Sequence, residues 1–387
     1  MRFTSGNELL SQLEMKDNRL HSLLEITNAI NSNLPVESLF KIFSFILKEQ
    51  LSFSRFVLFI KEEEWHCPVK VGYKGRVDLD LIHSELYRFK EITLVESSNS
   101  NLLSDFQAVI PVSHQGKPLA YLMISTVGKT ELLEPAHFSF AQTLANIIAV
   151  AVENNRLVKQ HIIKERISKE LEVASEMQKM LFPSELPSNR KMDLSGRYIP
   201  RHAIGGDYYD FIPLGDEEYI ICIGDVSGKG ISAAMLMANF QATIRTLFKY
   251  QRFEMSFLME ELNKLVMKSA KGEKFITFFL AHYNAYTRKM TYVNAGHNHP
   301  ILLNGRKVTM LKDGCIGLGM LDELPSIKVG KLVLNPNTTF VLFTDGVVEL
   351  ENESGEQFSV EQLIKNVQAY SPLKMEDMNN IIFSKLE

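Results

Sequence analysis

The stretches GGDYYDF at residues 205–211 and GDVSGKG at residues 224–230 decide how this chain folds, together with TDG at residues 344–346. Each stretch places an aspartate beside a glycine, near the end of a predicted strand. Glycine permits tight turns and the close approach of a ligand, and Mg²⁺ and Mn²⁺ prefer carboxylates and other oxygen ligands. A single Asp-Gly pair is most often only a turn. Three such corners from distant segments instead predict a divalent-cation site.

Apolar runs beside two of these stretches predict the elements that carry them. Residues 219–223 form a continuous apolar run, which predicts a buried strand with Asp225 at its exit. Residues 230–250 have apolar side chains at helical spacing, so a helix is expected there. Residues 340–343 form a second apolar strand that leads to Asp345. Carboxylates at the ends of two buried strands are well placed to converge.

Taken together, these segments resemble the SpoIIE-type branch of the metal-dependent serine/threonine protein phosphatases, the PPM superfamily. The resemblance runs from about residue 170 to residue 359, and the motifs match in both order and spacing. It also includes LFP at 181–183, TYVNAGH at 291–297 and LFTDGVVE at 342–349. The resemblance implies a central β-sandwich flanked by helices, with a dinuclear Mn²⁺ or Mg²⁺ centre at one end of the sandwich.

The resemblance also assigns the residues that would hold the cations. Asp225 would bridge the two metal ions. The backbone carbonyl of Val226 and the carboxylate of Asp207, directly or through water, would ligate one ion, and Asp345 would ligate the other. A water bound to such ions ionises near neutral pH and attacks phosphorus in line. No covalent phosphoenzyme, and no catalytic side chain beyond the metal-activated water, is therefore expected.

Two nearby residues stay outside this predicted site. His297 could act as a general acid, but a turn histidine that bonds to the backbone is the more common role. Cys222 lies inside an apolar run and is interpreted as a core residue, not a nucleophile.

The carboxyl end departs from the family pattern. The family normally ends with an Asp-Asp pair that enters a final strand, and one of these aspartates completes the second metal site. This sequence instead ends at Glu387, within a predicted helix at 378–386. The nearest acidic pair, Glu376 and Asp377, is more typical of a helix start, so Asp377 is only a minor alternative ligand. The chain is predicted either to be truncated or to hold only one metal ion firmly.

The composition indicates a modular intracellular protein. A chain of 387 residues is long enough for two or three domains. Its three cysteines are odd in number and far apart, which argues for a reducing compartment. A net charge of −4 without a basic cluster gives no reason to expect nucleic-acid binding. We recognise no signal peptide and no apolar run of the ~20 residues that span a bilayer, so we expect a cytoplasmic location.

Residues 36–152 are predicted to form a separate domain, so that the whole chain is a multidomain α+β protein. The strands are expected at 54–60, 108–112 and 119–124. The helices are expected at 36–50, at 78–90 and from 135 onward. A hairpin turn at Gly116 joins the last two strands. This order of elements resembles a GAF sensor domain, which implies an unknown small-molecule or protein signal, or dimerisation.

A long helix is expected to link this domain to the phosphatase domain at 190–387. No glycine or proline interrupts residues 136–182, and a helix of that length spans roughly 70 Å. Its apolar residues follow a heptad-like seam with a phase break at Ile162–Ile163, and residues 1–35 carry an earlier seam. A linker at 153–185 is therefore predicted to form a parallel dimeric stalk. The alternative is that these helices pack on their own domains.

These features predict a signal-regulated protein serine/threonine phosphatase that acts as a homodimer. By family resemblance, its substrate is a phosphorylated anti-anti-sigma factor of the STAS type in bacterial partner switching. The main alternative is a non-catalytic binding or scaffold protein that keeps the phosphatase fold. Retention of Asp207, Asp225 and Asp345 argues against the scaffold. A small-molecule phosphohydrolase that uses the same metals is a third hypothesis.

Overall fold

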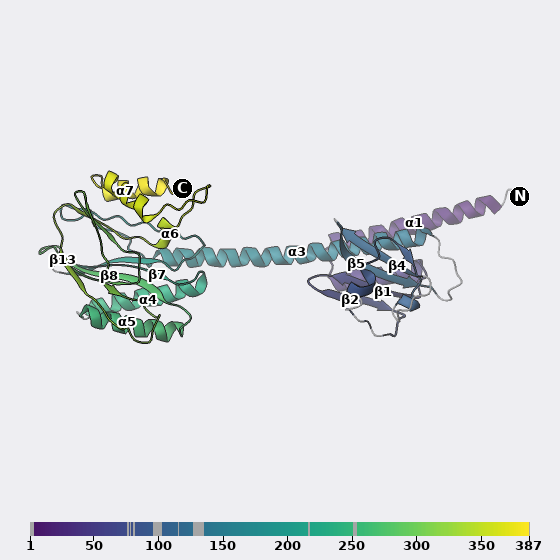
Figure 1. The fold of residues 1–387 in the computed structure, drawn as a ribbon. Coiled ribbons are helices and arrows are strands. Elements are labelled where there is room, and N and C mark those ends of the chain that lie inside the picture. The colour runs from purple at the N-terminus through teal and green to yellow at the C-terminus, as the bar shows by residue number, and fades with distance from the viewer. Residues whose placement is uncertain are drawn as a thin grey trace. The chain divides into compact units, whose positions relative to one another are not determined.

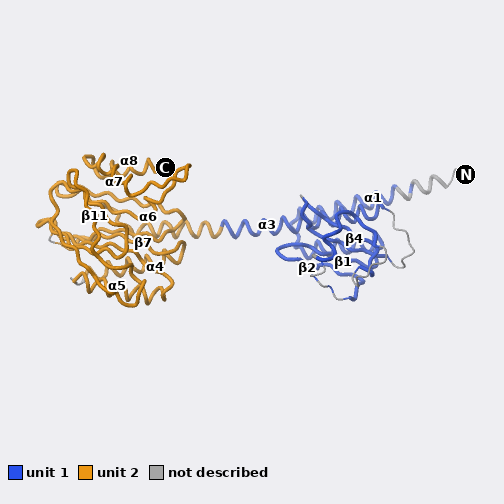
Figure 2. The backbone as a smooth tube through the Cα atoms, viewed as in Figure 1, with its two compact units in different colours: residues 1–165 blue, residues 166–387 orange. Residues whose placement is uncertain are grey.

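The computed structural model describes residues 4–75, 77, 79, 82–95, 103–114, 116–126, 135–215, 217–250 and 254–386. The chain divides into two units, residues 1–165 and 166–387, and the division lies within one long helix (Figure 2). Each unit combines helices with β-sheet (Figure 1), so the predicted α+β class is confirmed.

Unit 1 is built around one antiparallel five-stranded sheet with the order β2-β1-β5-β4-β3. Its helices and turns are α1 (Thr4–Asn31), α2 (Val36–Phe45), the π turns η1 (Ile46–Gln50) and η2 (Ile82–Leu86), and the 3₁₀ turn η3 (Leu103–Asp105). Its strands are β1 (Arg55–Lys61), β2 (Trp65–Val71), β3 (Thr93–Leu94), β4 (Ala108–His114) and β5 (Lys117–Ser125). The three predicted strands are confirmed in β1, β4 and β5. Of the helix predicted at 78–90, the described residues contain only η2 and the turn after it.

Both faces of this sheet are buried. Phe56 and Leu58 on β1 pack in the apolar cluster formed with α1, α2 and the start of the long helix. Val57 and Phe59 point to the opposite face, where Trp65, Tyr121 and neighbouring aromatic side chains form a second cluster. This alternation is the period of two that a strand imposes on its side chains.

The predicted long helix is present as α3, which runs without interruption from Pro135 to Lys179. Several of its apolar residues are exposed in the single chain, among them Val158, Ile162, Ile163 and Ile167. Among the described residues, α3 alone has the length and apolar content to cross a membrane, through a window with a mean hydropathy of 1.2. Half of that window is buried within the protein, and a buried core helix passes the same test. The absence of a membrane span therefore stays a prediction.

Unit 2 contains two sheets. The larger has the order β12-β9-β8-β7-β6 with β13 also paired to β9, and the smaller has the order β11-β10-β14. The strands are β6 (Tyr208–Gly215), β7 (Glu218–Val226), β8 (Ile276–Asn284), β9 (Lys289–Ala295), β10 (Ile301–Asn304), β11 (Lys307–Met310), β12 (Gly314–Cys315), β13 (Gly330–Val333) and β14 (Thr338–Val341). The helices are α4 (Ile231–Tyr250), α5 (Met255–Ala270), α6 (Asp345–Val348), α7 (Val360–Tyr370) and α8 (Met375–Ser384).

These elements form four layers, helix on sheet on sheet on helix. Ile220 and Cys222 of β7 pack against α4 and α5 on the outer face of the larger sheet. Ile223 points the other way and joins Phe279 and Leu302 in the cluster between the two sheets. The smaller sheet is covered by α7 and α8, which lie on the side away from α4 and α5 in Figure 1. The predicted sandwich flanked by helices is confirmed.

Two predicted boundaries are wrong, and each has a local cause. The strand predicted at 340–343 ends at Val341, which pairs with the first residue of β10, Ile301. The residue before Ile301 is Pro300, which has no N–H to continue a ladder. Asp225 lies inside β7 and not beyond it, because β8 extends far enough to pair Thr277 with it.

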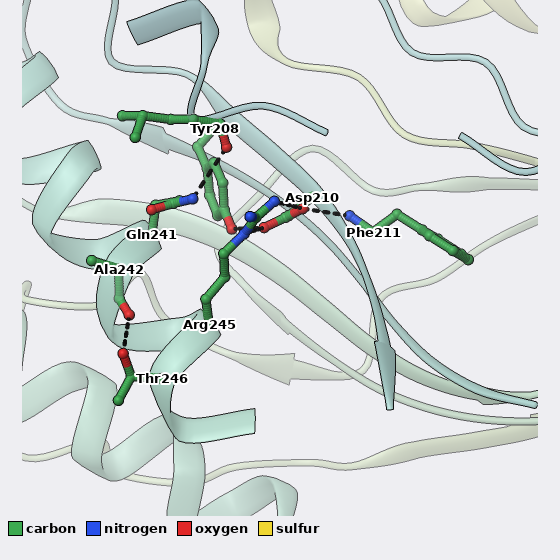
Figure 3. Close-up of polar contacts among 8 residues, drawn as sticks. Tyr208, Asp210, Phe211, Gln241, Ala242, Arg245 and Thr246 are labelled. Carbon is green, nitrogen blue, oxygen red and sulfur yellow. Dashed lines mark hydrogen bonds and ion pairs between the residues drawn. The ribbon is translucent and has the colours of Figure 1, made fainter. Parts of the chain in front are cut away.

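A buried ion pair fastens β6 to α4 (Figure 3). The carboxylate of Asp210 is fully buried, and Arg245 of α4 donates to both of its oxygens, from Nε at 2.7 Å and from Nη2 at 2.9 Å. The Tyr208 hydroxyl donates to the same carboxylate at 2.7 Å, and the backbone N–H of Phe211 donates at 2.9 Å. The first residues of β6 are thus fixed on α4, the helix that follows β7.

Arg245→Met is expected to destabilise unit 2, because it leaves the Asp210 carboxylate buried without its cation. Removing one partner of a buried pair is costly, but the Arg245 side chain is 45% exposed, so we expect a loss of up to about 3 kcal/mol. A hollow of about 270 Å³ beside Arg245 leaves room for the new side chain. Chemical denaturation would measure the loss.

The control for this measurement is Lys264→Met, which breaks an exposed ion pair with Glu261 and should leave the denaturation midpoint nearly unchanged. Adding Asp210→Asn to Arg245→Met should recover part of the lost stability. A parental midpoint for Arg245→Met would show that the ion pair does not fasten β6 to α4.

Candidate functional site

Asp207 and Asp225 lie side by side at one end of the larger sheet. Asp207 immediately precedes β6, whose first residue, Tyr208, pairs with Gly224 of β7. This register places the two acids next to each other, and their carboxyl groups share a hydrogen bond. Asp225 is on the same face of β7 as Ile223, so the acid pair lies at the end of the space between the two sheets.

The environment of this pair disfavours two negative charges. Burial, followed by the charge of Asp207, raises the pKa of Asp225 to about 8. Burial also raises the pKa of Asp207, although hydrogen bonds from Asp225 and Thr344 oppose the shift. Like charges held close together in a buried site repel each other unless a proton or a cation lies between them.

The third predicted stretch, at residues 344–346, reaches Asp207 and Asp225 through the segment that follows β14. Thr344 Oγ1 donates a hydrogen bond to Asp207 Oδ2 at 3.0 Å. Asp345 begins α6 and is exposed, and its negative charge also raises the pKa of Asp207 and of Asp225. The three aspartates are therefore neighbours. Within the described part of the chain, however, no three His, Cys, Asp or Glu side chains are already arranged as a set of metal ligands.

The Val226 carbonyl lies against the glycines that precede Asp207. A β-carbon on Gly206 would lie 2.9 Å from Val226 O and 3.4 Å from the β-carbon of Ala233. Only a glycine lets the backbone pass so close without displacing the carbonyl. The predicted carbonyl ligand and the two predicted carboxylate ligands are thus parts of one packed corner.

The donors of this corner fit a hard divalent cation. All of them are oxygens, two are carboxylates in mutual contact, and the raised pKa of Asp225 shows that the pair lacks a positive partner. Cation binding would replace the proton that the two acids share. The predicted substitute ligand, Asp377, is exposed in the first turn of α8.

Sequence reasoning missed two residues beside the acid pair. One is Thr344, whose hydroxyl orients Asp207. The other is Tyr198, whose hydroxyl is buried and has no hydrogen-bond partner among the described residues. Burial raises the pKa of this phenol, and the charges of Asp207 and Asp225 raise it further. Thr344 stands in the TDG stretch, but that stretch indicated a role only for Asp345, and no pattern in the sequence marks Tyr198. The partners of both residues are far away along the chain.

His297 is buried behind the site. Its Nδ1 is 2.9 Å from the hydroxyl of Thr277, the residue that pairs with Asp225, and its backbone N–H donates to Asn294 Oδ1 at 2.8 Å. Burial lowers the pKa of His297 to about 4, so the ring is neutral at pH 7 and holds no proton to give as an imidazolium. The Cys222 thiol is fully buried, and burial raises its pKa, as for a core residue.

Comparison with known proteins agrees with this geometry. Residues 215–387 match the family model described as "Stage II sporulation protein E (SpoIIE)". The chain is 28% identical over 284 residues to "Phosphoserine phosphatase RsbU" of Bacillus subtilis (strain 168), an alignment that covers 71% of this chain and 83% of RsbU. It is 25% identical over 190 residues to "Phosphoserine phosphatase RsbP" of the same strain, which covers 47% of this chain and 45% of RsbP.

Among solved structures, the SiaA-PP2C domain of Pseudomonas aeruginosa is similar with a TM-score of 0.50 and 19% identity. The similarity covers 58% of this chain and 90% of that domain, and it concerns the fold. The matched stretch contains most of the sandwich together with Asp225, Val226 and Asp345, whereas Asp207 lies just before it. Over residues 215–387, the chain's carboxy-terminal unit is therefore similar to the SpoIIE family of domains.

Proposed function

We propose that this protein is a metal-dependent protein phosphatase that removes phosphate from phosphoserine or phosphothreonine. The observation that carries the proposal is the contact between Asp207 and Asp225 at the end of a SpoIIE-type sandwich. Two relatives whose names give them phosphoserine phosphatase activity, RsbU and RsbP, support it.

In this proposal the acid corner holds Mn²⁺ or Mg²⁺. Asp225 would bridge two ions, Asp207 and the Val226 carbonyl would hold one of them, and Asp345 would hold the other. When bound, such cations lower the pKa of a water molecule and neutralise charge on phosphoryl oxygens. Thr344 holds the Asp207 carboxylate in one orientation through its 3.0 Å hydrogen bond. Asp345 is more exposed than the other two acids, which supports weaker binding of the second ion.

The proposed substrate is a phosphorylated STAS-type protein, and the proposed signal acts on the GAF-like unit 1. The proposed state is a homodimer joined along α3. The exposure of Ile162, Ile163 and Ile167 on a helix that continues between the two units supports such a seam. A scaffold that has lost catalysis would have no use for two half-buried acids that repel each other.

Asp225→Asn is expected to lower Mn²⁺-dependent hydrolysis of a phosphoserine protein by about a thousandfold or more, while the fold is retained. Folding raises the pKa of Asp225 to about 8, so its ionisation opposes folding above about pH 4. An amide removes that cost, and the Tm of the metal-free variant at pH 7 should equal or exceed that of the parent. Turnover and thermal melting would measure both effects.

Asp17→Asn is the matched control, since Asp17 is exposed on α1 in unit 1, and it should leave turnover unchanged. Parental Mn²⁺-dependent turnover by Asp225→Asn would show that the metal assignment is wrong. Activity of the parent on an aryl phosphate but not on a phosphoserine protein would favour the small-molecule phosphohydrolase. No activity on either, with intact Mn²⁺ binding, would favour the scaffold.

A double variant, Ile167→Asp with Leu171→Asp, is expected to make the protein monomeric and to change its basal phosphatase rate. Two charges on the seam would oppose helix pairing, and a coupling of ~1–3 kcal/mol corresponds to a change of about five- to a hundredfold. Sedimentation would give the oligomeric state, and Ser168→Asp, off the seam, serves as the control. A monomeric double variant with the parental rate would exclude regulation through the stalk.

A further inference from the structure

The last turns of α3 contain one polar residue that is buried, Gln178. Gln178 is only 6% exposed, whereas the nearby Met177 and Met180 are 65% and 79% exposed. Its side-chain amide makes two hydrogen bonds to a single residue. Nε2 donates to the carbonyl oxygen of Gly205 at 2.7 Å, and the N–H of Gly205 donates to Oε1 at 3.1 Å.

These two bonds satisfy the backbone of Gly205 as a neighbouring strand would. The segment Gly205–Gly206 belongs to no strand, so its peptide groups need partners from elsewhere. Gln178 supplies both a donor and an acceptor, which only an amide side chain can do in this geometry. The helix end therefore holds a piece of irregular backbone in a defined place.

The same segment is confined on its other side. A β-carbon on Gly205 would lie 2.1 Å from the Tyr198 hydroxyl, and one on Gly206 would lie 2.9 Å from Val226 O. Phe182, just beyond α3, stacks on the Tyr198 ring with centroids 4.5 Å apart. The two glycines thus lie between the end of α3 and the carbonyl of the acid corner, with little free space.

Asp207 follows this segment directly, and the residues after it are fixed. Tyr208 and Asp210 are bonded to α4 through Arg245, as Figure 3 shows. Gln241, one turn before Arg245, donates to the carbonyl oxygen of Leu181 at 3.1 Å. The backbone at Asp207 is consequently held by one anchor downstream, the ion pair, and one anchor upstream, the Gln178 amide, while Thr344 orients the carboxylate itself.

We propose that Gln178 is a positioning residue for the metal centre: its amide holds Gly205 so that the Asp207 carboxylate meets Asp225 at the spacing a divalent cation requires. The inference rests on the proposed function, because it takes Asp207 to be a metal ligand. It adds a residue of the linker helix to the machinery of the site, although that residue touches neither metal nor substrate. Loss of a group bonded directly to a metal ligand typically weakens metal affinity about ten- to a hundredfold, and the lower end of that range is expected for Gln178, which acts through Gly205.

The test compares Gln178→Met with Lys179→Met in the full chain. Methionine preserves the length of Gln178 and removes both hydrogen bonds, whereas Lys179 is an exposed neighbour on the same helix. Mn²⁺ binding would be measured by calorimetry, and phosphatase activity would be titrated with Mn²⁺. We expect the Kd for Mn²⁺ to rise about tenfold for Gln178→Met, the rate at saturating Mn²⁺ to stay within about threefold, and Lys179→Met to match the parent.

Gln178→Asn gives a second measurement in case the methionine variant does not fold. It keeps the amide but shortens its reach, so its Kd should lie between those of the parent and Gln178→Met. A lower Tm with an unchanged Kd, in whichever variant folds, would overturn the inference and leave Gln178 a structural residue. Equal Mn²⁺ binding by the parent and by Asp225→Asn would instead overturn the proposed metal site itself, so the two failures are distinguishable.

Discussion

Two half-buried carboxyl groups, those of Asp207 and Asp225, repel each other, and the rest of unit 2 must hold them together. The register between β6 and β7 brings the acids into contact, and burial raises the pKa of both. Repulsion between them would separate the strand ends if the backbone were free to move. Arg245 of α4 holds β6 through Asp210, and Thr344 in the segment after β14 holds the Asp207 carboxylate.

The apolar layers of the sandwich explain how the fold tolerates the repulsion between Asp207 and Asp225. Ile223 and Phe279 lie between the sheets and Cys222 lies against the helices, so β7 is buried on both faces for most of its length. The apolar contacts of the strand favour folding, while the acids at its end oppose it. The proposed metal site thus lies at the last residues of a strand whose stability comes from apolar contacts elsewhere along it.

Much of this unit was predictable because its signals are local. The apolar run at 219–223 and the helical spacing over 230–250 correspond to β7 and α4. The path from β14 to Asp345 was not predictable in detail, because Pro300, just before the partner strand β10, decides where the ladder ends. Gln178 also escaped prediction, since a heptad pattern counts apolar residues and its partner Gly205 is 27 positions away. The metal-ligand roles of Asp207, Val226, Asp225 and Asp345, the GAF resemblance and the dimeric stalk stay predictions.

The crowding around Gly206 limits what sequence change this corner can accept. A β-carbon there would contact Val226 O at 2.9 Å, so a relative with any other residue at this position must have moved the carbonyl, the preceding segment, or both. Whether glycine is kept at this one site is therefore a test, readable from sequence alone, of whether a related domain has the same corner. Sequence changes at the exposed ends of unit 2 would not show whether a related domain has the same corner.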